Sequence, residues 1–199
     1  MYDIQNNKIF VKLFDVKTYG WEMAGKGNFI IIEREKALLT HGGMWLLWYY
    51  KKKFKDFIIT LEWKVSNRSD NSGVFVRFPN PFTDPNIAIE YGYEIQIDDI
   101  GSPDGNSIHR TGAIYNHKGP SPKKQSLSKQ VAIGRWNIFE IIVIQQSYSV
   151  TLNKIKIVTN FIGNRSLEGY IGLQNHDDGS KVYFRNIMIK ELKSKNLSL

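Results

Sequence analysis

The sequence predicts an all-β protein, a sandwich of two antiparallel sheets, and three observations support this prediction. Along most of the chain, hydrophobic residues alternate with polar ones, which is the period of a strand with one buried face. The alternating segments are rich in β-branched and aromatic residues, and turn sequences separate them. No segment combines a helical period with helix caps. About thirteen short strands in one chain are typical of a sandwich or a barrel.

The alternation is clearest in the middle of the chain. Phe57–Val65 places Glu62 and Lys64 on one face and hydrophobic residues on the other, and Gly73–Phe78 places Arg77 opposite its valines. Each segment therefore predicts a half-buried strand. Further strands are expected at Ile9–Phe14, Phe29–Glu33, Ala37–Thr40, Met44–Trp48, Tyr91–Asp98, Ala113–Tyr115, Asn137–Gln145, Ser147–Leu152, Lys154–Thr159, Gly169–Gln174 and Lys181–Leu192.

The chain is expected to form a single domain over residues 1–199. A chain of 199 residues is long enough to bury a hydrophobic core without disulfides. No internal repeat divides it. Two long loops interrupt the strands, at residues 79–89 and 116–135, and loops of this length in a compact domain are usually functional or mobile.

Composition excludes several classes of protein. The absence of cysteine excludes disulfide scaffolds, thiolate metal sites and a cysteine nucleophile. The net charge of +8 is spread along the chain without a nucleic-acid-binding signature, so no nucleic-acid partner is expected. No apolar stretch is long enough to span a membrane, and no membrane partner is expected. The N-terminus lacks the apolar region of a secretion signal, so a cytoplasmic location is expected.

Polar residues on the strand Tyr91–Asp98 form the candidate site. Glu94, Gln96 and Asp98 project from the same face of this strand. If the neighbouring strands share its sheet, one face combines carboxylates, cations, amides and a histidine, which suits a hydroxyl-rich ligand. The other residues expected there are Glu62, Lys64, Arg77, Gln174 and His176, with Trp48 as a surface for stacking on a sugar ring.

Other interpretations of these residues stay open. A polar strand face is also ordinary on a solvent-facing sheet, and for any single tryptophan a place in the core is the better expectation. Glu94 and Asp98 form a weak candidate for a glycosidase carboxylate pair, because their Cα atoms lie about 13 Å apart along a straight strand. His176 lies in a turn sequence, where it can be a base, a metal ligand or a surface residue. No spacing is diagnostic of a metal site.

The ordered set of short motifs in this chain resembles the 3-keto-disaccharide hydrolase domain family. The resemblance extends from about residue 10 to residue 192. The matching segments are Leu13–Asp15 with Gly20-Trp21, Lys55–Phe57 with Leu61–Lys64, Asn71–Arg77, Tyr93–Asp98, Thr111–Tyr115, Arg135–Asn137, Val150–Asn153, Gly169–His176 and Val182–Ile187 continuing to Leu192.

This resemblance implies a concanavalin-like jelly roll and substrates that are glycosides oxidised to a ketone at sugar carbon 3. The ketone acidifies the proton on C2, so a base can remove it, the C1 substituent leaves and water adds back. Glu94, His176 and Arg77 are the expected catalytic residues, with Glu94 or His176 as base and Arg77 or Lys64 stabilising the enolate oxygen. A divalent metal held by Glu94 and His176 is an alternative stabiliser.

Substrate binding is assigned to the remaining polar residues, and two other functions stay open. The expected partner is a carbohydrate, a keto-glycoside, bound through Glu62, Lys64, Gln96, Asp98, Gln174 and Trp48. The same face would serve a non-catalytic, lectin-like module that holds unmodified sugars. A domain that binds another protein would show no sugar binding. The sequence does not indicate the oligomeric state.

Overall fold

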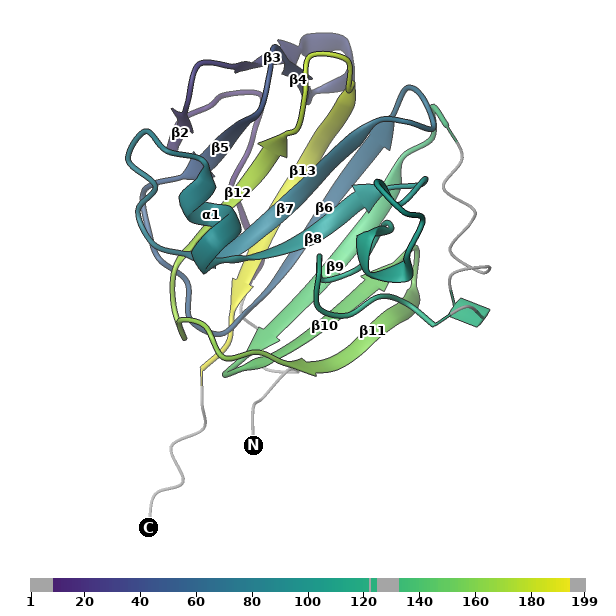
Figure 1. The fold of residues 1–199 in the computed structure, drawn as a ribbon. Coiled ribbons are helices and arrows are strands. Elements are labelled where there is room, and N and C mark those ends of the chain that lie inside the picture. Colours follow the sequence, from purple (N-terminus) through teal and green to yellow (C-terminus); the bar gives the residue numbers. More distant parts are fainter. Residues whose placement is uncertain (1–8, 122, 125–132, 194–199) are drawn as a thin grey trace.

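A computed structural model describes residues 9–121, 123–124 and 133–193, and two antiparallel sheets packed face to face form this part of the chain (Figure 1). Residues 122 and 125–132, within the second predicted loop, lie outside the described residues. The all-β prediction is confirmed. Among the described residues, the longest α-helix, α1 (Asn86–Tyr91), has six residues, and no helix is long and apolar enough to cross a membrane.

The larger sheet has eight strands and the smaller one has five in the described part of the chain. The larger sheet runs β11 (Ile155–Ile162), β10 (Ser147–Leu152), β9 (Asn137–Ile144), β6 (Phe57–Val65), β13 (Val182–Glu191), β4 (Ala37–His41) and β3 (Asn28–Ile32), with β1 (Val11–Lys12) paired to β13. The smaller sheet runs β2 (Trp21–Ala24), β5 (Trp45–Tyr49), β12 (Tyr170–Asn175), β7 (Asn71–Phe78) and β8 (Tyr93–Asp98).

The core lies between the two sheets and follows the predicted alternation. Leu61 and Trp63 of β6 are buried in the same hydrophobic cluster as Val74 and Val76 of β7 and Ile95 of β8. Since successive side chains point to opposite faces of a strand, the residues between these positions must project from the outer face of one sheet or the other. The outer face of the smaller sheet is therefore the place where Glu94 and Gln96 emerge.

A second, smaller cluster covers part of that outer face. Helix α1 places Ala88 against Leu46 and Trp48 of β5 and against Phe75 and Phe78 of β7. The helix falls at the end of a predicted loop and shortens the strand predicted from Tyr91, so that β8 begins at Tyr93. A helix of under two turns is too short to display a 3.6-residue period, which explains why it was not predicted.

Other differences from the predicted elements are small. The strand expected at residues 9–14 is reduced to the two residues of β1, and the strand expected at residues 113–115 is reduced to isolated bridges from Ile114 to Ile95 and to Lys118. Strand β2 and two short 3-10 helices (Glu33–Glu35 and Ser107–His109) were not expected.

Strand β7 contains a bulge that changes which way one side chain points. Tyr170 pairs with Phe78 and Ile171 pairs with Val76, so Arg77 has no partner position on β12. Arg77 has a φ of +59°, a left-handed backbone conformation that is uncommon for residues other than glycine. An extra residue in one strand reverses the facing of its neighbours. Simple alternation therefore fails at this residue.

The outer edge of β8 is bonded to the segment 111–115. The N–H of Gln96 donates to the carbonyl of Ala113 at 3.0 Å, and the N–H of Tyr115 donates to the carbonyl of Glu94 at 2.9 Å. These backbone bonds continue the ladder of the smaller sheet by one irregular segment. They also fix Tyr115 beside Glu94.

Candidate functional site

A polar pocket of about 420 Å³ opens on the outer face of the smaller sheet. Its polar floor comes from β7, β8 and β12, where cross-strand pairing of Gly73 with Gln96 and of Phe75 with Glu94 places their side chains on one face. Its walls come from loops and from helix α1. The lining residues are Met44, Ser69, Asn71, Ile89, Glu94, Gln96, Ser102, Pro103, Tyr115, Gln174, His176 and Asp177.

Glu94 is buried in this pocket without a compensating partner. Glu94 is only 8% exposed, and its Oε1 atom has no hydrogen-bond partner. Burial disfavours the charged form and raises the pKa of the Glu94 carboxyl from 4.5 to about 8. A strongly raised carboxyl pKa in a pocket is typical of a proton-transfer group.

Gly73 provides the space that the Glu94 carboxyl occupies. A Cβ atom at position 73 would lie 2.1 Å from Glu94 Oε1, which is closer than any real contact. The glycine lies on β7 directly opposite Gln96, in the strand next to Glu94. Its role here is steric, because its backbone is extended and needs no left-handed conformation.

Two further buried oxygen atoms in the floor lack donors. Gln96 donates from Nε2 to Asn71 Oδ1 at 3.2 Å, and its own Oε1 has no partner. The Oε1 atom of Gln174 is also buried without a partner. Buried polar groups are nearly always hydrogen-bonded in folded proteins. Together with Glu94 Oε1, these atoms form a set of acceptors suited to the hydroxyl groups of a ligand.

His176 is held beside the floor by Asp177. Its Nδ1 lies 2.8 Å from Asp177 Oδ2, which leaves Nε2 as the nitrogen for a ligand. Partial burial would raise the pKa of the Asp177 carboxyl, but hydrogen bonds from His176 and Ser180 hold this pKa below its usual range. A carboxylate on one ring nitrogen fixes the orientation of the imidazole, as in acid–base catalysts.

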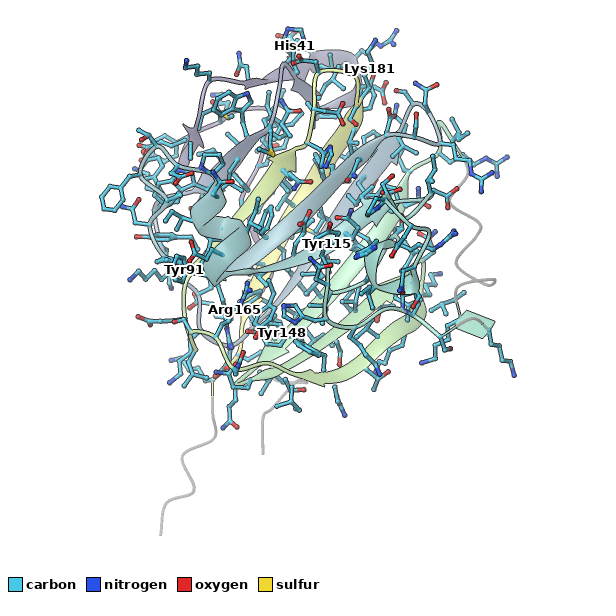
Figure 2. The ribbon with its side chains drawn as sticks, viewed as in Figure 1. His41, Tyr91, Tyr115, Tyr148, Arg165 and Lys181 are labelled. Atoms are coloured by element: carbon cyan, nitrogen blue, oxygen red, sulfur yellow. The ribbon has the colours of Figure 1, made fainter. Side chains whose placement is uncertain are left out.

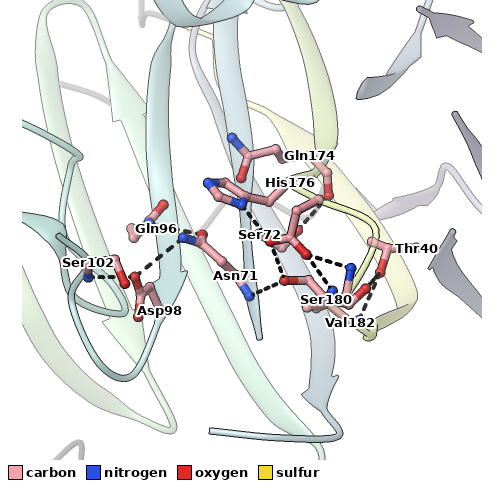
Figure 3. A network of polar contacts seen from close by, with 12 residues as sticks. Thr40, Asn71, Ser72, Gln96, Asp98, Ser102, Gln174, His176, Ser180 and Val182 are labelled. Atoms are coloured by element: carbon pink, nitrogen blue, oxygen red, sulfur yellow. Dashed lines mark hydrogen bonds and ion pairs between the residues drawn. The ribbon is translucent and has the colours of Figure 1, made fainter. Parts of the chain in front are cut away.

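A chain of hydrogen bonds links the His176 loop to β8 (Figure 3). The Ser180 hydroxyl donates to Asp177 at 2.9 Å and accepts from the backbone N–H of Asn71 at 2.9 Å. The Asn71 amide in turn donates to Asp98 at 3.4 Å. The two sides of the pocket are therefore positioned by one network.

Asp98 belongs to this network and does not line the pocket, which corrects its expected role in binding substrate. Its Oδ1 accepts from the backbone N–H groups of Ile100 and Gly101, and its Oδ2 accepts from that of Ser102. These bonds fold the loop after β8 and bring Ser102 and Pro103 to the pocket wall. Asp98 is thus a residue that shapes the loop.

Arg77 lies away from the pocket, so its expected place beside Glu94 is wrong. The bulge turns its side chain inward, where it is fully buried and donates to the backbone carbonyls of Lys55 and Gln145. It also lies 3.3 Å from Asp56 and from the Tyr148 hydroxyl, both outside the smaller sheet. Arg77 therefore connects the two sheets at their edge.

Glu62 and Lys64 lie on the other sheet, and their expected convergence with Glu94 is wrong as well. Strand β6 pairs with β9 and β13, so its polar face is the outer face of the larger sheet. There Glu62 pairs with Arg185 at 2.7 Å and Lys64 pairs with Glu35. The hydrophobic core separates both residues from the pocket.

Trp48 is on the expected face but does not line the pocket. Its ring is buried beside Tyr170, at 4.7 Å between ring centroids, within the cluster beneath helix α1. A stacking role on a sugar ring would require an exposed face. The structure places this tryptophan in the smaller hydrophobic cluster instead.

Several pocket residues were not expected from the sequence. Asn71 and Tyr115 occur in the motifs that carry the family resemblance, and this was the one signal that pointed to them. Ser102 and Pro103 reach the pocket only because Asp98 folds their loop. Met44 contributes to the wall from the turn before β5.

The pocket offers oxygen and imidazole donors to a cation but contains no dense cluster of them. Within the described residues, no group of three or more His, Cys, Asp or Glu side chains is arranged to hold a metal ion. Glu94 and His176 line the same pocket, together with the amide oxygens of Gln96 and Gln174. These side chains share one pocket, but the described residues do not form a metal-binding group there.

Residues 10–190 of the chain match the model of a protein family described as the 3-keto-alpha-glucoside-1,2-lyase-like domain. No curated protein matches the chain in sequence.

Three of the solved structures with the same architecture have names that refer to carbohydrates. A candidate glycosyl hydrolase from Parabacteroides distasonis ATCC 8503 superposes with a TM-score of 0.73 at 24% identity, over 92% of this chain and 94% of that one. The carbohydrate-binding module CBM66 from Bacillus subtilis gives 0.57 at 13% identity, over 88% and 96%. The lumenal domain of VIP36, bound to Ca²⁺ and Man3GlcNAc, gives 0.53 at 11%, over 94% and 90%. These likenesses confirm the jelly-roll fold.

Proposed function

The chain belongs to the family of 3-keto-alpha-glucoside-1,2-lyase-like domains, and from this premise we propose that it cleaves the glycosidic bond of 3-keto-glycosides. The observation that carries the proposal is the buried Glu94 carboxyl, whose Oε1 has no partner and whose pKa is raised to about 8. A carboxylate with such a pKa is a far stronger base than an ordinary one, and a C–H bond beside a ketone needs a strong base.

In the first step, Glu94 removes the proton from C2 of the 3-keto sugar. The C2–H bond breaks, the proton passes to the Glu94 carboxylate, and the electron pair forms a C2=C3 double bond with the negative charge on the oxygen at C3. Without the ketone, that proton is too weakly acidic for a side-chain base. The enzyme therefore leaves ordinary glycosides intact.

In the second step, the enolate expels the aglycone. The C3 carbonyl re-forms, a C1=C2 double bond appears, and the bond from C1 to the glycosidic oxygen breaks. His176, oriented by Asp177, passes a proton from Nε2 to the departing oxygen. Water then adds its hydroxyl to C1 and a proton returns to C2, so the net reaction is hydrolysis to a free 3-keto sugar and the aglycone alcohol.

The acceptor atoms of the floor support binding of a sugar in this position. Gln96 and Gln174 each have a buried amide oxygen without a donor, and sugar hydroxyls are donors of the required kind. A ligand that satisfies buried acceptors removes a penalty of about 1–3 kcal/mol for each one. The floor of the pocket is thus suited to a hydroxyl-rich molecule.

The test is turnover of a 3-keto-glycoside in deuterated water, followed by NMR at C2 and by release of the aglycone. We expect deuterium at C2 of the product and no reaction with the unoxidised glycoside. Glu94→Gln and His176→Ala should each lower turnover by about 10²–10⁴-fold, the usual contribution of an acid–base group. Hydrolysis without C2 exchange would show direct displacement and overturn the proposal.

A second candidate function is a non-catalytic carbohydrate-binding module. The likeness to CBM66 and the unsatisfied amide oxygens favour it, because the same floor can hold an unmodified sugar. Titration calorimetry with unmodified glycosides separates the two functions. Binding of such sugars without turnover of any 3-keto-glycoside would identify the binding module.

A further inference from the structure

The proposed chemistry needs a hydrogen-bond donor for the enolate oxygen, and the cations expected for this task are elsewhere. Arg77 bonds inside the protein and Lys64 lies on the opposite sheet. The buried atoms of the floor that lack partners are acceptors, which repel a developing oxyanion. Among the hydroxyl groups of the pocket lining, that of Tyr115 belongs to a residue bonded directly to the backbone of Glu94.

Tyr115, a side chain with a hydroxyl donor, lines the pocket and is bonded to the backbone of Glu94. Its backbone N–H donates to the carbonyl of Glu94 at 2.9 Å, and its half-buried side chain lines the same pocket. In Figure 2 Tyr115 lies in front of β8. A phenol is among the side chains that form oxyanion holes, because it is a neutral donor that can remain in a partly dry site.

The phenol ring is held in place from behind. Its centroid lies 5.2 Å from that of His109. The imidazole of His109 is itself clamped, with Nδ1 at 2.7 Å from Asp104 and Nε2 at 2.8 Å from Asn116. A donor that does not reorganise during the reaction gives the largest electrostatic stabilisation.

We infer that Tyr115 is a catalytic residue, which donates its phenolic hydrogen bond to the C3 oxygen of the 3-keto sugar and stabilises the enolate formed when Glu94 removes the C2 proton. The inference rests on the proposed function. The proton stays on Tyr115 throughout: the bond to O3 shortens as charge develops and lengthens when the carbonyl re-forms.

The protonation of Tyr115 supports this role. Burial first, and then the negative charge of Glu94 and Asp98, raise the pKa of the Tyr115 phenol. The hydroxyl therefore remains a donor at the pH where the Glu94 carboxylate forms, near its pKa of about 8. Base and donor are thus both in their active states over one pH range.

The experiment isolates enolate formation by using a 3-keto sugar without a leaving group, 1,5-anhydro-3-keto-glucitol, in deuterated water. Wild-type protein should exchange the C2 proton of this compound, and Tyr115→Phe should exchange it about 10²–10³-fold more slowly, the usual loss for one oxyanion donor. Turnover of a 3-keto-glycoside should fall by the same factor while KM stays within about threefold. Tyr183→Phe, on the other sheet, is the matched control and should leave both rates unchanged.

A second variant covers the case in which Tyr115→Phe perturbs the loop. Replacing Tyr115 with a ring-fluorinated tyrosine keeps the ring and lowers the pKa of the phenol, so the alkaline limb of the pH–rate profile should move to lower pH. A tyrosine that only packs against His109 would leave this limb in place. Normal exchange by Tyr115→Phe overturns the inference, whereas no exchange by wild-type protein overturns the proposed function itself.

Discussion

At Gly73, the lack of a side chain determines where the Glu94 carboxyl can lie. Gly73→Ala would place a methyl group 2.1 Å from Glu94 Oε1, so the carboxyl must move. Because a displacement of about 1 Å can cost 10²-fold in rate, we expect turnover to fall by about that factor. Steady-state kinetics with a 3-keto-glycoside measure this loss.

A double variant checks that the loss comes from this contact. Once Glu94→Ala has removed the carboxyl, Gly73→Ala should lower turnover no further, because coupled residues are not additive. A further large loss in the double variant would mean that Gly73 acts through the substrate or the sheet.

The Glu94 carboxyl should also make the protein less stable as the pH rises. Its pKa is about 8 in the folded protein and near 4.5 in the unfolded chain, so between these values the folded state binds more protons. The free energy of unfolding should therefore fall with increasing pH across this window, by about 1.4 kcal/mol per pH unit at most. Below pH 4.5 the contribution of Glu94 is constant.

Glu94→Gln removes this titration and should be more stable than wild-type protein near pH 8 and about equally stable near pH 4.5. Urea unfolding at the two pH values measures the difference. Over the same window the wild-type rate should rise, because the base is the carboxylate. Equal stability of the two proteins near pH 8 would contradict the raised pKa.

At the scale of single elements, the bulge in β7 turns Arg77 into a structural residue. Arg77→Met removes a fully buried charge and its bonds to Lys55 and Gln145. Breaking a buried ionic network typically lowers the free energy of unfolding by about 3–5 kcal/mol. Turnover per folded molecule should change little, since Arg77 does not line the pocket.

Arg185→Met is the matched control for this experiment. Arg185 also pairs with a carboxylate, but its side chain is 29% exposed, and such pairs contribute about 0–1 kcal/mol. Chemical denaturation of both variants should therefore separate them clearly. A loss of turnover by Arg77→Met in a stably folded protein would return Arg77 to the catalytic site.

The elements themselves were largely predictable, because period-two alternation can be read directly from residues such as those of β6 and β8. The direction of the Arg77 side chain was not predictable, since a bulge adds one residue to a strand without altering its hydrophobic pattern. Asp98 was assigned to the correct face of β8. Its actual role depends on the backbone of the loop at residues 100–102, which no side-chain pattern reveals.

At the scale of the whole molecule, the sandwich separates two polar faces that look alike in the sequence. Glu62 and Lys64 alternate with hydrophobic residues just as Glu94 and Gln96 do. Alternation says that one face of each strand is polar, but not which sheet the strand joins. That choice depends on long-range pairing, here of β6 with β9 and β13.

This separation predicts that residues on the outer face of the larger sheet do not contribute to catalysis. Glu62 and Lys64 lie on the far side of the core from the pocket, and packed sheets are themselves about 10 Å apart. Their substitution by Gln and Met therefore does not touch the reacting groups. We expect turnover of a 3-keto-glycoside by either variant to stay within about twofold of wild type, the range of surface changes away from the reacting groups. A loss of turnover as large as that of Glu94→Gln would mean that the reaction takes place on the larger sheet and not in the pocket.

The segment at residues 111–115, which carries Tyr115, also has a consequence for how the molecules behave toward one another. A bare strand at the border of a sheet is a template onto which another chain can add, leading to aggregation. The bonds from Gln96 and Glu94 to this segment occupy that template on β8. The segment that supplies Tyr115 to the pocket thus also covers this edge of β8, where a second chain could otherwise pair.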